Sequence, residues 1–169
     1  MEVRRARETD KEAIMDIYAR AREFMAEQGN PTQWDESYPS SALVDSDIQA
    51  DGYVVVEDDA IIGVFVLSEH AQEPSYKTID GAWLNDEPYA VIHRCASDGI
   101  HKGVGSYLMD WCSTQCSNIR IDTHEDNIPM RNLLKKKGYE YCGKIHYFAE
   151  DYGEDLGERL AFQRITPAQ

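Results

Sequence analysis

The segment from Ser97 to Ser106 (SDGIHKGVGS) has the residue types of a phosphate-binding loop, and it joins a predicted strand to a predicted helix. Gly103 and Gly105 let backbone amides approach a ligand without interference from a Cβ atom. The helix N-terminus adds unpaired N–H groups and a partial positive charge. His101 and Lys102 add positive character. The segment therefore predicts a site for an anion such as a pyrophosphate.

Three phosphate-binding patterns compete for this segment. The Walker A pattern G-x-x-x-x-G-K-[ST] does not fit, because Lys102 precedes the glycine pair. The dinucleotide pattern G-x-G-x-x-G fails at its third glycine, where Leu108 stands. The pattern that remains is x-x-x-G-x-G at the start of a helix, and residues 100–105 satisfy it.

A second pattern lies downstream of a predicted strand at 118–122. It reads N-x-x-x-x-x-L-x-x-x-x-G-[FY] and is matched by Asn127, Leu133, Gly138 and Tyr139. Together the two patterns resemble motifs A and B of the GNAT superfamily of N-acetyltransferases, and the resemblance extends over nearly the whole chain. Ile100 departs from the family, which usually has Gln or Arg at the head of motif A.

Hydrophobic periodicity and turn residues predict the elements that position these motifs. The first helix begins at a capping box formed by Thr9 and Glu12, and Asp58-Asp59 forms a two-residue hairpin turn. An acidic turn is predicted at 150–158, and Gly138 ends the last helix. Strands are predicted at 3–6, 52–57, 60–67, 90–96, 118–122, 139–145 and 159–165, and helices at 9–28, 41–49, 104–116 and 127–137.

This order of elements predicts an α+β fold with a late βαβ unit, whose crossover is right-handed. The resemblance implies the GNAT fold, in which three layers surround a mixed, mostly antiparallel sheet of about seven strands with about four helices. It also implies that the parallel strands at 90–96 and 118–122 splay apart to form a cofactor cleft.

Composition limits the classes of partner. The chain has 169 residues, which fits a single domain over 1–169, and its net charge is −14. That charge excludes a phosphate-backbone footprint and disfavours anionic membranes, so we expect no nucleic-acid or membrane partner. The acidic surplus suits a cationic amine, and it equally suits ordinary solubility. Oligomeric state stays open between a monomer and a homodimer.

Targeting signals and cysteine usage favour the cytoplasm. The longest apolar stretch, at 60–67, is far shorter than the about 20 residues that span a bilayer, and the N-terminus has no signal peptide. The four cysteines lack CxxC spacing and lie within apolar patterns, which predicts buried free thiols in a reducing compartment. They are Cys95, Cys112, Cys116 and Cys142.

The resemblance implies acetyl-CoA as cofactor, with CoA as product, and it implies which residues hold it. The pantetheine arm pairs with the main chain of Arg94, Cys95 and Ala96. The pyrophosphate lies on backbone amides of the loop, and the second motif flanks the cofactor. The loop residues are Ile100, His101, Lys102, Gly103, Val104, Gly105 and Ser106, and the flanking residues are Asn127, Met130, Leu134 and Lys137.

The implied reaction is acetyl transfer to a primary amine of a small molecule, an amino acid or a peptide N-terminus, by direct attack in a ternary complex. It requires a neutral amine, a donor to the developing oxyanion and a proton for the leaving thiolate. Many family members supply that proton from a tyrosine at the position of Leu134. The departures at Leu134 and Ile100 keep an alternative open, a non-catalytic acyl-CoA-binding regulatory module of the same fold.

Few residues could move protons. His93 lies on the strand before the loop, and Glu125 lies at the end of the next strand. His93 also fits a hydrogen-bonded core histidine, and Glu125 also fits a helix N-terminus that favours negative charge. No metal is expected, since the histidine and cysteine spacing fits no metal motif. For the acceptor side, the aromatic residues Trp34, Tyr38 and Tyr89 are candidates, and packing explains them equally well.

Overall fold

The computed structural model describes the backbone of residues 1–149 and 154–167, and it forms an eight-stranded sheet in the order β1-β2-β3-β5-β6-β8-β7-β4. The predicted order of elements is confirmed, with one strand more than expected, the two-residue β4. Part of the predicted turn at 150–158 lies outside the described residues, and β8 already begins at Glu154. The strands are β1 Glu2–Arg5, β2 Gly52–Glu57, β3 Ala60–Ser68, β4 Asp80–Gly81, β5 Ala90–Ser97, β6 Asn118–Thr123, β7 Glu140–Ala149 and β8 Glu154–Ile165.

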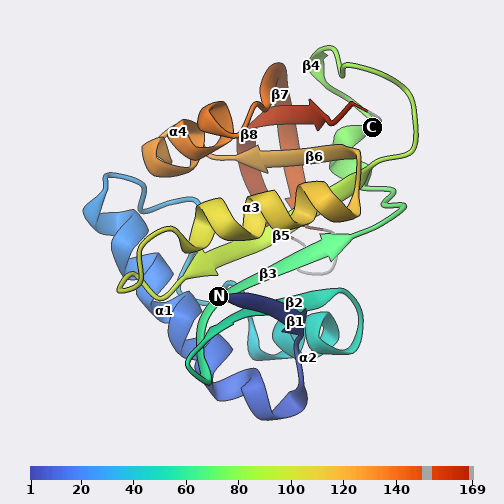
Figure 1. The fold of residues 1–169 in the computed structure, drawn as a ribbon. Coiled ribbons are helices and arrows are strands. Elements are labelled where there is room, and N and C mark those ends of the chain that lie inside the picture. Colours follow the sequence, from blue (N-terminus) through green and yellow to red (C-terminus); the bar gives the residue numbers. More distant parts are fainter. Residues whose placement is uncertain (150–153, 168–169) are drawn as a thin grey trace.

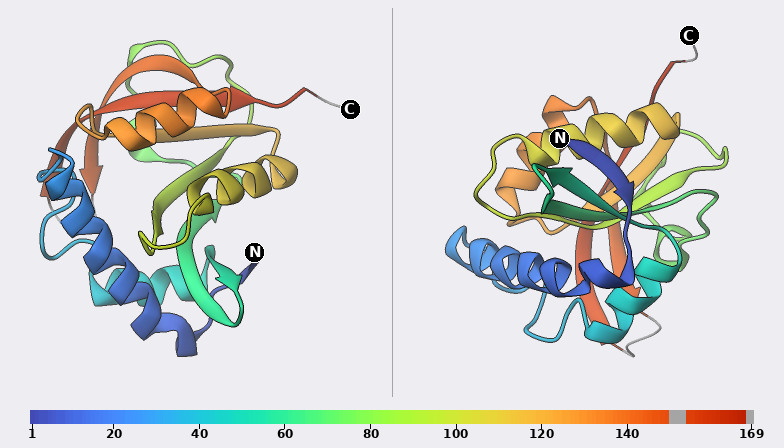
Figure 2. Two further views of the ribbon diagram at one scale, coloured as in Figure 1. Left: turned by 60° about the vertical axis from the view of Figure 1, so that its left-hand side comes forward. Right: turned by 60° about the horizontal axis from the view of Figure 1, so that its bottom comes forward.

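Two pairs of helices cover the two faces of the sheet (Figures 1 and 2). On one face, α3 (Val104–Gln115) and α4 (Ile128–Lys136) cover the central strands. On the other face lie α1 (Lys11–Glu27) and α2 (Ser41–Gln49). Short 3-10 turns, η1 (Glu8–Asp10) and η2 (Pro74–Tyr76), precede α1 and β4. The architecture is the α+β, three-layer arrangement that the sequence predicts.

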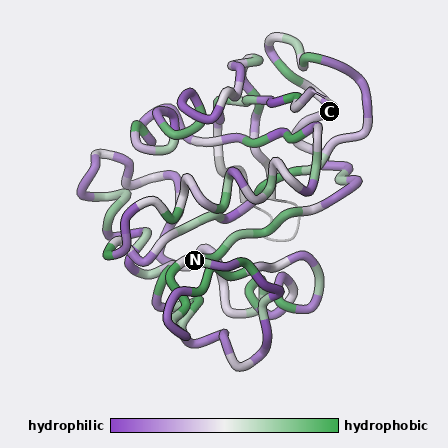
Figure 3. Tube along the Cα trace, viewed as in Figure 1, coloured by the Kyte–Doolittle hydropathy of each residue, from purple (hydrophilic) through white to green (hydrophobic). Residues whose placement is uncertain are grey.

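The two cores follow from strand alternation. Val55 and Phe65 point to the α3 face, whereas Val54 and Val64 point to the α1 face. The central strands are therefore apolar on both faces, and β3 is hydrophobic along most of its length in Figure 3. Such a strand is buried from both sides, as expected for the centre of a three-layer fold.

Several local signals act as predicted. Asp58 and Asp59 have φ of 49° and 63°, the left-handed pair that a two-residue hairpin turn requires. Asn127 caps α4, because its side chain accepts the Met130 amide, and Gly138 follows the helix at a φ of 81°.

The capping box predicted from Thr9 and Glu12 is wrong. Helix α1 begins at Lys11, after the 3-10 turn, and no side chain caps it. The Arg4 guanidinium holds the Asp10 carboxylate at 2.7 and 2.9 Å, and that carboxylate also accepts the Arg7 amide. Asp10, and not Thr9 or Glu12, therefore makes the capping contact at this end, one turn before the expected one.

The sheet opens between its two parallel strands. β5 and β6 are paired at Ala90 with Ile119 and at Val91 with Arg120, and their described register ends there. β5 also carries a bulge, since Arg94 and Cys95 together face Phe65 of β3. The predicted splay of these strands is confirmed, and it places an unpaired strand edge inside the molecule.

Candidate active site

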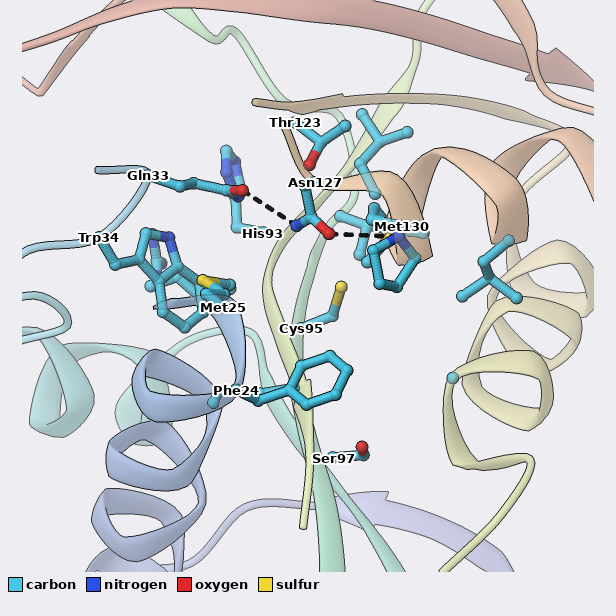
Figure 4. Close-up of a pocket in the computed structure, with 18 of the residues that line it drawn as sticks. Phe24, Met25, Gln33, Trp34, His93, Cys95, Ser97, Thr123, Asn127 and Met130 are labelled. Atoms are coloured by element: carbon cyan, nitrogen blue, oxygen red, sulfur yellow. Dashed lines mark hydrogen bonds between the residues drawn. The ribbon is translucent and has the colours of Figure 1, made fainter. Parts of the chain in front are cut away.

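A cavity of about 270 Å³ lies where β5 and β6 separate (Figure 4). Its lining comes from α1, the loop between α1 and α2, β5, α3, β6, α4, β7 and β8. Because the strands diverge there, the cavity touches residues of both sheet faces. We call its α3/α4 side the cofactor half and its α1/α2 side the acceptor half.

The cofactor half is mainly apolar and is lined by small or flexible groups. Gly105 borders it, and a Cβ at that position would lie 3.0 Å from Cδ2 of Leu133. Glycine thus keeps α3 and α4 close together beside the opening. The remaining lining on this side is Ile92, Cys95, Leu108, Met109, Ile121, Met130 and Leu133.

The predicted anion loop is partly occupied by its own residue Asp98. The carboxylate of Asp98 accepts the amides of Ile100 and His101 at 2.9 and 3.0 Å, and it contacts Nδ1 of His101 at 2.7 Å. These contacts lower the pKa of Asp98, so it stays ionised. The amides of Ile100 and His101 therefore donate within the loop and are not available to a ligand. Among the described residues, no group accepts a hydrogen bond from the amides of Lys102 to Ser106, so these amides remain for an anion.

Other loop residues have structural positions that the sequence did not predict. Ile100 is 68% exposed. The Val104 side chain is buried, and its Cγ1 would lie 2.6 Å from a Cβ at Gly63. Val104 can therefore face a ligand only through its backbone. Gly103 has φ of 79° and open space around it, so glycine is favoured there by its backbone conformation and not by a lack of room for a side chain.

On α4, the residues that face the cavity differ from those expected. Met130 and Leu133 line it, whereas Leu134 is fully buried in the core. Lys137 lies one turn further along and forms an ion pair with Asp110 of α3 at 2.7 Å. Leu134 and Lys137 thus stabilise the packing of α4, because successive positions on a helix point in different directions.

The bulge in β5 is held by residues from both helices of the opposite layer. Arg94 has a positive φ of 45°. Its carbonyl accepts the Tyr18 hydroxyl at 3.0 Å, and its guanidinium pairs with both carboxylate oxygens of Asp47, at 2.6 and 2.8 Å. Tyr38 lies 3.4 Å from the same guanidinium. Any contact of Arg94 with a cofactor would therefore use the remaining main chain.

His93 faces the acceptor half. Burial and the neighbouring Arg94 guanidinium lower its pKa to about 3, so the ring is neutral at pH 7. Its Nε2 lies 3.7 Å from Oε2 of Glu73. This geometry fits a neutral imidazole at the cavity wall.

Asp122 lies on the wall of the acceptor half, and sequence reasoning identified it only as part of a strand. It points to the face opposite Ile121, and its Oδ2 accepts the Tyr76 hydroxyl at 2.7 Å. Burial raises its pKa to about 6, whereas the Tyr76 hydrogen bond and the Arg159 charge lower it. Asp122 is the polar residue at the C-terminal end of the alternating strand NIRID, and this position at the end of a strand was the signal that could have found it.

A buried amide network joins the two halves of the cavity. Oε1 of Gln33 accepts from Asn30 at 2.8 Å and from Asn127 at 2.9 Å, and the Gln33 carbonyl accepts from Arg159 at 3.0 Å. Figure 4 shows Gln33 and the cap residue Asn127 joined above the cavity. The loop after α1 is thereby fixed to the start of α4.

Trp34 and Tyr38 line the acceptor half, as the sequence placed them, and their rings pack edge to face at 5.7 Å. Tyr38 is 8% exposed, and Trp34 also packs against Tyr18. Phe24 projects from α1 into the same cavity in Figure 4 and is 48% exposed. Phe24, Gln33, Tyr147 and Arg159 come from segments that the sequence gave no reason to bring together.

Tyr89 and Glu125 lie outside this cavity. The Tyr89 ring packs under the Arg120 guanidinium, at 3.9 Å, because it precedes the point where the strands separate. Glu125 is exposed and lines a separate groove with His124 and Thr32. The cavity therefore brings together His93, Trp34 and Tyr38 with the motif residues, and it leaves out Tyr89 and Glu125.

The fit of an acyl-CoA can be tested on the residues themselves. Thr123 is 1% exposed, lines the cavity, and has a hydroxyl oxygen without a hydrogen-bond partner among the described residues. Gly105 borders the cavity with backbone alone. An open strand edge, free amides and an unpaired hydroxyl fit the polar, extended arm of such a molecule.

Two further observations bear on the sequence predictions. All four cysteines are free, with Cys112 and Cys142 buried and Cys95 and Cys116 half-buried. Within residues 1–149 and 154–167, no helix has the length and apolar character needed to cross a membrane.

No protein-family profile and no curated protein matches the chain. Several solved structures, however, are similar to it. The chain is 28% identical to a GNAT-family acetyltransferase from Streptococcus agalactiae, with a TM-score of 0.84, over 99% of this chain and 96% of that one. A GNAT-family acetyltransferase from Listeria monocytogenes is 16% identical, with a TM-score of 0.67, over 97% and 94% of the two chains.

The same fold also carries other chemistry. A GNAT-like decarboxylase, solved in complex with isobutyryl-CoA, is 13% identical, with a TM-score of 0.64, over 98% of this chain and 99% of that one. The fold by itself therefore leaves the reaction to be argued from the site.

Proposed function

Because the chain belongs to the GNAT superfamily, we propose that it is an acyl-CoA-dependent acyltransferase that moves an acetyl group from acetyl-CoA to a primary amine. The acceptor class is a small molecule, an amino acid or a peptide N-terminus. We assign the activity to one domain over residues 1–169, and the free cysteines fit a reducing, cytoplasmic setting.

One observation carries this proposal, the cavity that passes through the sheet where β5 and β6 separate. Its cofactor half offers an unpaired strand edge for the pantetheine arm, and the amides of Lys102 to Ser106 at the adjoining start of α3 are available for the pyrophosphate. On the acceptor half it offers aromatic walls and ionisable groups. A donor and an acceptor can therefore meet from opposite faces of the sheet.

The bound acyl-CoA would supply a thioester, and this chain supplies the surroundings. Met130 and Leu133 exclude water from the apolar side, and Asn127 fixes the start of α4 beside it. Exclusion of water strengthens every hydrogen bond made to the reacting atoms.

Cys95 supports direct attack over an acyl-enzyme. It lies in the cavity, but burial raises the pKa of its thiol to about 12. The thiolate is the nucleophilic form of cysteine, and almost none of it exists at neutral pH with such a pKa. Transfer straight from the thioester to the amine in a ternary complex is the simpler route.

The first test is binding. Acetyl-CoA and CoA at about 100 times Kd should raise Tm by roughly 5 to 10 °C, while ATP and NAD should not. Gly103→Val should weaken acetyl-CoA binding at least about tenfold. Gly29→Val is the matched control, since both glycines have positive φ and open surroundings and Gly29 lies outside the cavity. Unchanged affinity in Gly103→Val would refute the loop as the pyrophosphate site.

The second test separates an enzyme from a regulatory module. CoA release is measured with acetyl-CoA and a panel of n-butylamine, 2-phenylethylamine, spermidine and L-leucine. Steady release with any of these amines supports the transferase. Tight acetyl-CoA binding without release would favour the non-catalytic module, which the buried Leu134 at the usual tyrosine position makes the natural competitor.

A further inference from the structure

Asp122 has the geometry of a group that meets the acceptor. It lies one residue before the end of β6, past the last described pair of β5 and β6, so its side chain borders the opening. Strand alternation directs it to the face of His93 and away from the face of Ile121, where the cofactor half lies. Asp122 is therefore a carboxylate of the acceptor half.

Its two oxygens have different environments. Oδ2 accepts the Tyr76 hydroxyl at 2.7 Å, and that tyrosine is buried against Trp83 and Tyr89. Oδ1 accepts no hydrogen bond from the described residues, although the side chain lines the cavity. Oδ2 is thus held by Tyr76, and Oδ1 is available to an acceptor that enters the cavity.

The ionisable neighbours of Asp122 come from every element packed against it. Arg159 lowers its pKa, Glu73 raises it, and burial raises it most, to about 6. An uncharged imidazole and buried phenols complete the surroundings. The facing groups are Tyr38 of the loop after α1, Glu73 and Tyr76 at η2, His93 of β5, Tyr147 of β7 and Arg159 of β8.

We propose that Asp122 is the catalytic base, which takes the proton from the acceptor amine through Oδ1 while Tyr76 holds Oδ2. This inference rests on the proposed transferase function and names the residue that makes the amine a nucleophile. It also restricts the acceptor to a primary amine small enough to bring its nitrogen through the aromatic walls of Trp34 and Tyr38.

Asp122 takes one proton from the ammonium group and leaves a lone pair on nitrogen. Attack by that nitrogen on the thioester carbon forms the C–N bond and breaks the C–S bond, with the bonding pair leaving on sulfur. The second nitrogen proton passes to the sulfur, and the proton on Asp122 returns to solvent.

His93 is the competing base on the same wall, and its environment argues against it. A ring whose pKa is about 3 holds a proton poorly at neutral pH, whereas a carboxylate with a pKa of about 6 is close to the range in which a general base works best. We therefore assign His93 a positioning role, beside the carboxylate of Glu73.

The test compares Asp122→Asn with wild type on the most active amine of the panel above. General base catalysis is worth about 100-fold or more, so kcat/KM should fall by at least that factor while acetyl-CoA affinity stays within about twofold. The wild-type profile of kcat/KM should rise with pH through about 6, and the variant should lack this limb. Asp45→Asn is the matched control, an exposed aspartate on α2 that pairs with Lys11 outside the cavity.

A second measurement needs no acceptor. Between pH 4 and 7 the Tm of Asp122→Asn should rise relative to that of wild type, whereas Asp45→Asn should follow the wild-type profile. If Asp122→Asn retains a tenth of the wild-type kcat/KM, or if its Tm profile matches wild type, the base assignment is wrong while the transferase can stand. If no amine of the panel raises CoA release by wild type above the rate without amine, the proposed function itself fails, and the base assignment fails with it.

Discussion

The two halves of the cavity are built by different means. The cofactor half uses backbone and small residues from consecutive elements, β5, α3, β6 and α4. The acceptor half adds to His93 of β5 and Asp122 of β6 charged and aromatic side chains from α1, the loop after α1, β7 and β8, which are far apart along the chain, and Tyr76 of η2 supports Asp122 from behind. The first follows from glycine positions and helix geometry, and the second depends on tertiary folding. The difference explains why one was predictable and the other was not.

The largest expected effect comes from the clamp that holds the bulge in β5. Arg94→Ala removes the partner of Asp47 and leaves a largely buried carboxylate unpaired, so the free energy of unfolding should fall by about 3–5 kcal/mol. Urea denaturation measures it. The double variant Arg94→Met with Asp47→Leu should recover much of the loss, because it buries no lone charge. A double variant as unstable as Arg94→Ala would contradict this explanation.

A smaller loss of stability is expected at Leu134, the position on α4 where many GNAT enzymes have a tyrosine. Leu134→Tyr forces a larger, polar side chain into a fully buried site, and the cost should be about 1–3 kcal/mol without any gain in kcat. Chemical denaturation and CoA release measure the two parts. A faster variant would mean that α4 can turn this residue toward the cavity.

Asn127 tests the link between the halves. Asn127→Ala removes the cap of α4 and the bond to Gln33, so stability should fall by about 1–2 kcal/mol. Acetyl-CoA affinity and the KM for the amine should both worsen, because one side chain supports both walls. Asn127→Asp keeps the cap and loses the bond to Gln33, so it should spare acetyl-CoA affinity and harm the KM for the amine.

The smallest change in catalytic rate is expected for Tyr76→Phe. Tyr76→Phe removes a hydrogen bond that stabilises the ionised form of Asp122, so the pKa of that carboxylate should rise above about 6. The acid limb of kcat/KM should then move to higher pH by up to about one unit, with little change in the plateau. An unshifted limb would show that the hydroxyl does not act on the reacting carboxylate.

The pH dependence of stability has a defined sign. The folded-state pKa of Asp122, about 6, exceeds the ordinary value of 3.8, so the folded protein holds this proton more tightly. Stability should fall as pH rises from 4 to 6 and stay lower above that, by roughly 3 kcal/mol for this group alone. Asp122→Asn should therefore be more stable than wild type at pH 7.5.

Sequence reasoning recovered most of the fold, because its signals are local. The hairpin at Asp58-Asp59, the cap at Asn127 and the helix end at Gly138 need no tertiary information. β4 was missed because two residues carry no periodicity. The start of α1 was misplaced because Asp10 pairs with Arg4, six positions earlier, and the helix pattern carries no sign of that contact.

The candidate site was recovered unevenly for the same reason. Motif spacing located Gly105 and Asn127 beside the opening. It could not reveal that Asp98 occupies two loop amides, or that Leu133 faces the cavity in place of Leu134. Asp122 and Tyr76 are separated by 46 positions, and nothing in either segment indicates the other.

The short seam where β5 and β6 pair, at Ala90 with Ile119 and Val91 with Arg120, affects how rigidly the two halves of the sheet are joined. Two described residue pairs join the four strands β1-β2-β3-β5 to the four strands β6-β8-β7-β4. A ligand that pairs with the open edge of β5 while touching α4 would connect these two blocks. Its arrival should therefore slow amide hydrogen exchange on both sides of the seam, in strands that never touch it. The bound ligand would thus act as a structural link between the two halves of the sheet.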